Sequence, residues 1–150
     1  MYKDILLPID LNHKSSWRTS LPVALGFCQC FKARLHVMTV IPNYGMSMVG
    51  EYFPEGFEKK HVESANKLLH AFTLEHIPKE VEVQHIVAQG TTYKEVLTTA
   101  EKIDVDLIIM GSHRPELKDY LLGPNSERVV RHSPRSVLVV RDNQPNDELL

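Results

Sequence analysis

In residues 106–111, Asp-Leu-Ile-Ile-Met-Gly, an aspartate is followed by a short, unbroken apolar run that ends at a glycine. The run is too short for an amphipathic helix, and its lack of polar alternation is typical of a β-strand covered on both faces. Residues 3–9 make a similar run near the start of the chain, and Asp10 follows it. Strands of this kind occur mainly in parallel sheets between two layers of helices, so the two runs favour the α/β class.

The rest of the chain alternates between helical and extended patterns. Further strands are predicted over residues 34–41, 80–88 and 136–140, and helices over residues 15–31, 58–75 and 123–132. Another helix begins at Thr91 or Thr92, and Glu95 completes a capping box with Thr92. Pro22 marks the true first turn of the first helix. Strands joined by helical crossovers predict a five-stranded doubly wound parallel sheet, Rossmann-like, with the order 3-2-1-4-5.

This topology predicts where a ligand binds. The site lies beyond the carboxyl ends of strands one and four, where Asp10 and Gly111 stand. Without a Cβ, Gly111 lets a ligand approach the backbone closely. Residues 123–126, Gly-Pro-Asn-Ser, open a helix whose first amides and positive end favour a phosphate, and the side chains of Asn125 and Ser126 can add donors. Alternatively, Asn125 or Ser126 is an ordinary cap of that helix, and Asp10 caps the helix after it.

The composition indicates one globular domain. The chain has 150 residues, of which 43% are hydrophobic and 24% charged, with a net charge of -2. We predict a single domain over residues 1–141 and a polar tail over residues 142–150. The charge gives no reason to expect nucleic-acid binding, and no run is long enough to span a membrane. With no secretory signal at its start, the chain is predicted to be cytoplasmic.

The cysteines and histidines show no metal-ligand spacing. Cys28 and Cys30 are interpreted as reduced thiols in or near the core, the alternative being a metal site for which the neighbourhood offers no further ligands. The eight histidines are interpreted as solvated or structural. We find no motif of a hydrolase elbow, a Walker A loop or a dinucleotide turn. Residues 43–56 are predicted to form a mobile loop near a ligand site.

Several stretches resemble the nucleotide-binding universal stress proteins. Residues 106–111 match the strand before that family's signature, G-x2-G-x9-G-[ST], and Gly123 is similar to its last glycine. The opening ILLPID, the strand end at residues 39–42 and the final residues 129–140 also match, so the resemblance covers nearly the whole chain. The segments SHRP and YLLG resemble the F-type subgroup.

Three differences from that signature affect the phosphate loop. Arg114 replaces the second glycine, eight residues (115–122) rather than nine precede Gly123, and Pro124 stands where serine or threonine is usual. Pro124 has no N–H to offer, and Pro115 biases Arg114 towards extended geometry. Arg114 either replaces lost amide contacts with a guanidinium fork or is a solvent-facing loop residue.

The resemblance implies an adenine-nucleotide site and its residues. Val40 would present backbone groups to the adenine, and Asp10 would accept hydrogen bonds from the ribose. The residues implied to line the site are Pro8, Ile9, Asp10, Val40, Met110, Gly111, His113, Arg114, Gly123, Asn125 and Ser126. The implied ligand is ATP or AMP, with or without Mg²⁺, and neither a flavin nor a structural metal is expected.

The resemblance also implies a function and an assembly. The expected function is that of a nucleotide-binding regulatory protein of the stress response, with at most slow ATP hydrolysis or autophosphorylation and no assigned catalytic residue. The alternative is a non-enzymatic interaction module of the same fold without a nucleotide; a flavoprotein-like enzyme shares only the architecture. Ser136–Val140 is an apolar edge strand, and by the resemblance it is expected to pair in a homodimer.

Overall fold

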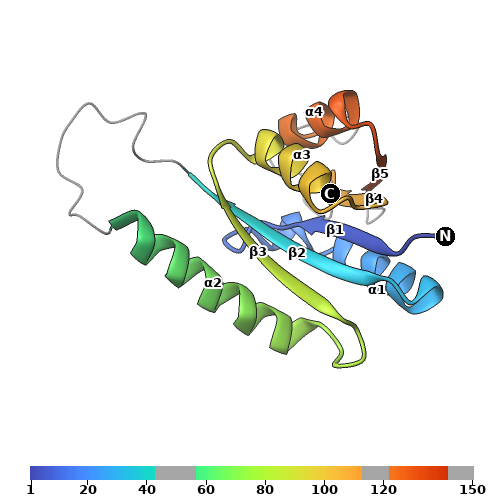
Figure 1. The fold of residues 1–150 in the computed structure, drawn as a ribbon, viewed down its shortest axis with the longest axis horizontal. Coiled ribbons are helices and arrows are strands. Elements are labelled where there is room, and N and C mark those ends of the chain that lie inside the picture. Colours follow the sequence, from blue (N-terminus) through green and yellow to red (C-terminus); the bar gives the residue numbers. More distant parts are fainter. Residues whose placement is uncertain (43–56, 113–121, 142–150) are drawn as a thin grey trace, which may run out of the picture.

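The computed structural model describes residues 1–42, 57–112 and 122–141, which form a parallel sheet between helices (Figure 1). In chain order the elements are β1 (Asp4–Pro8), the 3₁₀ helix η1 (Lys14–Ser16), α1 (Ser20–Phe31), β2 (Arg34–Ile41), α2 (Phe57–His76), β3 (Val83–Gln89), α3 (Thr92–Lys102), β4 (Leu107–Gly111), α4 (Pro124–His132) and β5 (Ser136–Val140). The five strands lie in the order β3-β2-β1-β4-β5, which confirms the predicted doubly wound sheet. The predicted loop at 43–56 and tail at 142–150 lie outside the described residues.

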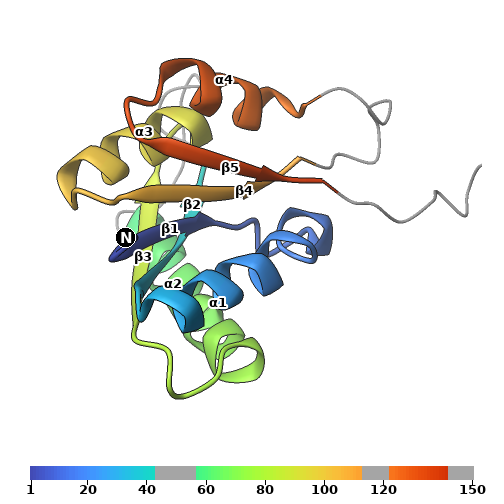
Figure 2. The ribbon, with the colours of Figure 1, turned by 90° about the vertical axis from the view of Figure 1, so that its right-hand side faces the viewer.

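The unbroken apolar runs are explained by helices on both faces of the sheet. Ile5 and Leu7 of β1 face the core shared with α1 and α2, whereas Leu6 faces the core shared with α3 and α4. All three side chains are fully buried, and burying each stabilises the fold by about 1.5–3 kcal/mol. Figure 2 shows the two helix layers, with α1 and α2 on one side of the sheet and α3 and α4 on the other. A strand covered in this way needs no polar face.

The first helix begins later than predicted. Residues 15 and 16 belong to η1, and α1 starts only at Ser20. Pro22 therefore lies in the first turn, as expected, where a missing N–H costs no helical hydrogen bond. The short η1 forms because the Ser16 hydroxyl bonds to the backbone of the preceding loop rather than continuing a helical pattern.

The predicted capping box at the start of α3 is wrong. The helix is capped at Thr91, and the Thr91 side chain makes no capping hydrogen bond. The Glu95 side chain instead folds against Gly90, where an added Cβ would lie 2.8 Å from the Glu95 Oε1. Gly90 has a φ of +141°, a conformation that favours glycine, and its N–H donates to the Ile41 carbonyl at 2.9 Å. The turn from β3 into α3 thus depends on Gly90.

The two cysteines have different surroundings, as expected from their spacing on a helix. Cys28 is buried in the core beside β1, whereas Cys30 is exposed, and neither forms a disulfide. Burial raises the pKa of the Cys28 thiol to about 11, so this group stays protonated and chemically inert at neutral pH.

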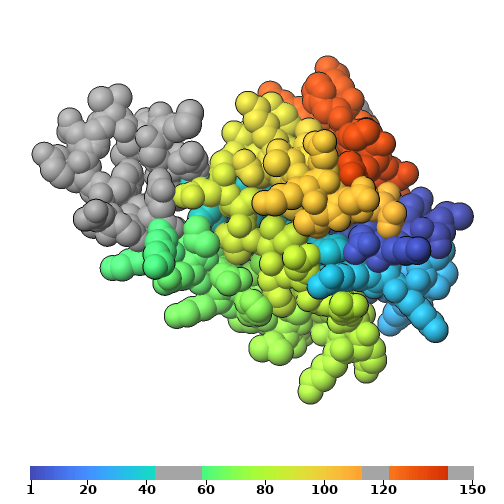
Figure 3. Space-filling view, in the orientation of Figure 1, coloured from blue at the N-terminus to red at the C-terminus, as the bar shows by residue number. Residues whose placement is uncertain are grey.

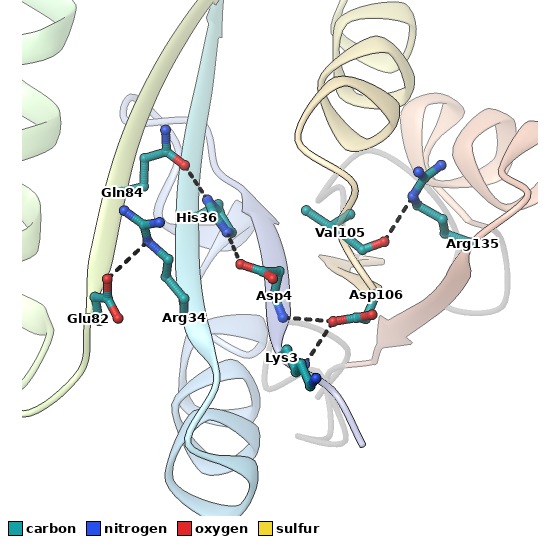
Figure 4. Close-up of polar contacts among 9 residues, drawn as sticks. All are labelled: Lys3, Asp4, Arg34, His36, Glu82, Gln84, Val105, Asp106 and Arg135. Atoms are coloured by element: carbon teal, nitrogen blue, oxygen red, sulfur yellow. Dashed lines mark hydrogen bonds and ion pairs between the residues drawn. The ribbon is translucent and has the colours of Figure 1, made fainter.

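Polar side chains form a chain across the amino end of the sheet (Figure 4). His36 bonds through Nε2 to the Asp4 Oδ1 at 2.8 Å and through Nδ1 to the Gln84 Oε1 at 2.5 Å. The Asp106 Oδ2 accepts the backbone N–H groups of Lys3 and Asp4, both at 2.8 Å. These bonds join residues of β1, β2 and β3 with the residue before β4.

The surface shows the same layers. In the space-filling view the side chains of α2 (green) and those of α3 and α4 (yellow to red) lie on opposite sides, with β3 between them (Figure 3). Every residue of β3 is partly exposed, as expected at a sheet edge. None of the described helices has the length and apolarity that a membrane span requires.

Candidate functional site

A cavity of about 320 Å³ opens at the carboxyl ends of β1, β2 and β4. This is the position that the strand order predicts, because the connections after β1 and β4 leave the sheet towards opposite faces. The described residues that line it are Pro8, Ile9, Asp10, His13, Ser15, Ser16, Met38, Val40, Thr92, Met110, Gly111, Ser112, Gly123, Asn125 and Ser126. Its volume falls in the range usual for small-molecule sites.

One wall of the cavity is the loop after β1, and its own hydrogen bonds hold it. The Asp10 carboxylate accepts from the Asn12 N–H at 2.9 Å and contacts the His13 Nδ1 at 2.9 Å. The Asp10 N–H donates to the Ser16 Oγ at 2.8 Å, and that hydroxyl donates to the carbonyls of Asp10 and His13. Asp10 therefore closes an Asx-type turn, and the alternative in which it caps the following helix is wrong.

The opposite wall is the start of α4. Gly123 is the N-cap residue and makes no side-chain cap, so the alternative of a cap at Asn125 or Ser126 is wrong. Pro124 occupies the first helical position, which leaves the N–H groups of Asn125 and Ser126 without a partner inside the helix. The Ser126 hydroxyl donates to the Gly111 carbonyl at 2.8 Å. Its proton is engaged there, so Ser126 offers a ligand its backbone N–H rather than its hydroxyl proton.

The missing side chain of Gly111 has a structural consequence that the sequence did not predict. A Cβ added at Gly111 would lie 3.2 Å from the Ser16 carbonyl oxygen and 3.6 Å from that of Ser15. The missing side chain therefore lets the loop after β1 approach the end of β4. In this structure the close approach is made by the protein's own backbone, and it places one wall of the cavity directly against the end of β4.

Val40 directs backbone groups towards the cavity. The Met38 carbonyl accepts from Ile9 on the β1 side, at 2.8 Å, and the Ile41 carbonyl accepts from Gly90 on the β3 side, at 2.9 Å. Because successive residues of a strand alternate sides, the N–H and C=O of Val40 point to the β1 side. There β1 has already ended at Pro8, so this donor and acceptor face the cavity that Val40 lines.

Nine of the eleven residues predicted for the site line this cavity. The other two, His113 and Arg114, lie outside the described residues. What these residues bind stays a prediction at this point. The sequence analysis missed six lining residues: His13, Ser15, Ser16, Met38, Thr92 and Ser112. Ser112 could have been found, because it directly follows a strand's carboxyl end, and Met38 belongs to a predicted strand that the site adjoins.

The cavity has little charge of its own. Asp10 and His13 are its only titratable lining residues within the described part of the chain. Over those same residues, no cluster of three or more His, Cys, Asp or Glu side chains is arranged to hold a metal ion. The geometry therefore offers backbone donors and acceptors, a helix amino end and one His–Asp pair, set between the apolar side chains of Met38 and Met110.

Comparison with known proteins gives a consistent relationship along the chain. A sequence profile of the universal stress protein family matches residues 1–141. Universal stress protein MJ0577 of Methanocaldococcus jannaschii is 31% identical, over 94% of this chain and 96% of that protein. The solved structure of MJ0577 matches with a TM-score of 0.71 at 32% identity, covering 97% of this chain and 99% of the other.

Two further solved structures share the fold and hold nucleotides. The universal stress protein from Archaeoglobus fulgidus in complex with dAMP has a TM-score of 0.66 at 15% identity, covering 93% of this chain and 98% of that one. A universal stress protein in complex with cAMP has a TM-score of 0.60 at 20% identity, covering 93% and 97%. The family profile spans residues 1–141, and the MJ0577 relative aligns over 94% of this chain at 31% identity. The chain belongs to the universal stress protein family.

Proposed function

We propose that the cavity binds an adenine nucleotide, ATP or AMP, and that the protein uses this binding in a regulatory role in the stress response. The observation that carries the proposal is the position of the α4 amino end and the Val40 backbone on one cavity at the switch point of the sheet. Solved relatives of the same fold in complex with dAMP and cAMP support the ligand class.

The base would bind at the end of β2. The N–H and C=O of Val40 form a donor and acceptor pair, which matches the N1 acceptor and the exocyclic amino donor of adenine. Met38 and Met110, both buried, supply apolar surface for the ring. The remaining lone pairs of the Asp10 carboxylate can accept from ribose hydroxyls. These contacts use the backbone for recognition, so the surrounding side chains can vary without loss of the site.

The phosphates would bind at the start of α4. The free N–H groups of Asn125 and Ser126 and the positive end of the helix favour an anion there. Because Pro124 supplies no N–H, this chain has one amide fewer than a helix with serine or threonine at that position. We therefore propose that the site binds the nucleotide, with or without Mg²⁺. The most activity that we propose for it is slow ATP hydrolysis or autophosphorylation.

Isothermal titration of the purified protein with ATP, AMP and GTP tests the ligand. We expect heat for the adenine nucleotides and weaker binding of GTP, because guanine reverses the donor and acceptor order that Val40 reads. No heat from any of them at about millimolar concentration, equivalent to a binding energy near 4 kcal/mol, would reject the proposal and favour an interaction module without nucleotide.

Two glycine variants test whether this cavity is the site. Gly111→Val should weaken ATP binding by roughly tenfold, because its side chain would push back the loop at Ser15 and Ser16. Gly26→Val is the matched control, since an added Cβ at Gly26 meets no atom within 4 Å. Equal ATP affinity in the two variants would place the nucleotide elsewhere.

We also propose a homodimer through β5. This strand has β4 as its only neighbour in the described sheet. The Ser112 N–H donates to the Val140 carbonyl at 3.0 Å, so by strand alternation the N–H and C=O of Val139 point away from β4 to the open edge. An apolar edge with free backbone groups favours pairing with a second copy.

Light scattering tests the dimer. Val139→Pro removes the outward N–H without touching the β4–β5 ladder and should convert a dimer to a monomer. Val139→Ala keeps that N–H and should remain dimeric. Leu138 is less suitable, because its side chain packs against the core. A monomeric wild-type protein, or a dimeric Val139→Pro variant, would exclude this interface.

A further inference from the structure

His13 lies in the cavity although nothing in the sequence pattern marked it as a ligand residue. Contacts with Asp10 and Ser16 fix it in the loop after β1. Its N–H donates to the Asp10 carbonyl at 3.1 Å, its carbonyl accepts from the Ser16 hydroxyl at 2.7 Å, and its ring Nδ1 meets the Asp10 Oδ2 at 2.9 Å. The side chain is 69% exposed, so the ring is held in place and remains open to a ligand.

The contact with Asp10 decides which ring nitrogen carries a proton. An ionised carboxylate only accepts hydrogen bonds, so the Nδ1 of His13 must be the donor. This tautomer is assigned from the bonding pattern. The Nε2 makes no hydrogen bond to another described residue, so it is the ring nitrogen with a lone pair open to a proton or a ligand. When it gains one, His13 becomes a cation with a free N–H donor at the cavity.

The charges around His13 show what that proton would do. From the facing elements, β2 presents Met38 and Val40, β4 presents residues 110–112, α3 presents Thr92 and α4 presents residues 123–126, none of them titratable. Lys14 follows His13 in the loop, and its ammonium lies 6.0 Å from the centre of the Trp17 ring. Among the described lining residues the Asp10 carboxylate is therefore the one negative charge, and protonated His13, which contacts it, would offset that charge.

We infer that His13 is a specificity-determining residue that favours phosphorylated over unphosphorylated ligands and couples their binding to the uptake of one proton from solvent. This inference rests on the proposed nucleotide site. The one bond formed is the N–H at Nε2, whose proton comes from solvent, and the imidazolium and the amino end of α4 then line the same cavity. A neutral nucleoside such as adenosine gains nothing from the added charge.

Titration calorimetry at two pH values tests the inference. We compare ATP with adenosine at about pH 6 and about pH 8, on either side of the range in which imidazole changes charge. Wild-type protein should bind ATP roughly threefold to tenfold more tightly at the lower pH than His13→Gln does, with little difference at the higher pH. The ionisation of ATP itself is common to both proteins and cancels in that ratio.

Matched measurements separate His13 from general effects of charge. His132→Gln, at the far end of α4, should behave as the wild-type protein at both pH values. Buffers of different ionisation enthalpy should show more proton uptake on ATP binding in wild-type protein than in His13→Gln, and adenosine should show no such difference. His13→Asn provides a second uncharged variant should His13→Gln fail to fold.

The outcomes distinguish this inference from the proposed site. If His13→Gln binds ATP with the pH dependence and proton uptake of wild-type protein, the inference is overturned and the nucleotide site stands. If wild-type protein binds neither ATP nor adenosine, the nucleotide site fails and the inference fails with it. A loss of the pH dependence in His13→Gln, with adenosine binding retained, supports both.

Discussion

At the amino end of the sheet polar side chains join neighbouring strands, whereas at the carboxyl end polar groups line a cavity. At the amino end, His36 joins Asp4 to Gln84, and the Asp106 carboxylate holds the backbone of Lys3 and Asp4 (Figure 4). At the carboxyl end, the N–H groups of residues 125 and 126 have no partner inside their helix. Both ends belong to the same strands.

The difference teaches how one sheet separates stability from function. Buried polar groups that find partners tie strands together, and partnerless ones cost free energy unless a ligand or water satisfies them. The hydrogen bonds at the amino end therefore hold neighbouring strands together, and His36, which makes two of them, is only 3% exposed. The carboxyl end keeps donors and acceptors available. Changes at the amino end should affect unfolding and leave ligand binding intact, and changes at the cavity should do the reverse.

The largest effect is expected from His36→Ala. The change removes a buried ring and leaves Asp4 and Gln84 without their shared partner, so the free energy of unfolding should fall by about 2–4 kcal/mol. Urea denaturation measures this loss, and calorimetry on the folded variant should show unchanged ATP affinity. His132→Ala, which removes an exposed ring, should cost less than about 1 kcal/mol. A His36→Ala variant as stable as wild-type protein would break the proposed contrast between the two ends.

Much of the fold followed from the sequence because the strands are buried on both faces. The runs at residues 5–9 and 107–110 have no polar position, and this pattern has few other structural explanations. The edge strand β3 was less well predicted: it starts at Val83 rather than at residue 80, because the Val81 N–H turns back to the Pro78 carbonyl. A partly exposed strand has a weaker pattern, so its ends depend on local turns.

The strand order predicted the residues at the centre of the candidate site but not those at its rim. Asp10 and Gly111 were placed by strand order alone, and both line the cavity. The sequence analysis missed His13 and Ser16 because hydrogen bonds of their side chains and backbone in the loop after β1 set their positions. Such bonds leave no periodic pattern in the sequence. Thr92 was interpreted as a cap, and only the turn at Gly90 brings it to the cavity.

A smaller effect is expected on the pH dependence of the free energy of unfolding, to which the amino end of the sheet contributes through Asp106. Backbone hydrogen bonds from Asp4 and Lys3, the first being the stronger cause, hold the pKa of Asp106 below its usual value of 3.8. A depressed pKa means that the ionised carboxylate stabilises the folded state above about pH 4, and that this stability is lost as the pH falls through the lowered folded pKa.

Asp106→Asn isolates that contribution. Both hydrogen bonds go to one oxygen, which the amide retains, so only the charge is lost. Because the carboxylate is exposed, we expect a loss of only about 0.5–1 kcal/mol at neutral pH, shrinking towards zero as the wild-type carboxyl becomes protonated in acid. Urea denaturation across this pH range measures it, with Glu101→Gln on the exposed side of α3 as the control. If the variant's loss of unfolding free energy were just as large below the folded pKa, the charge of Asp106 would not be its cause. At that pH the wild-type carboxyl is uncharged, like the amide that replaces it.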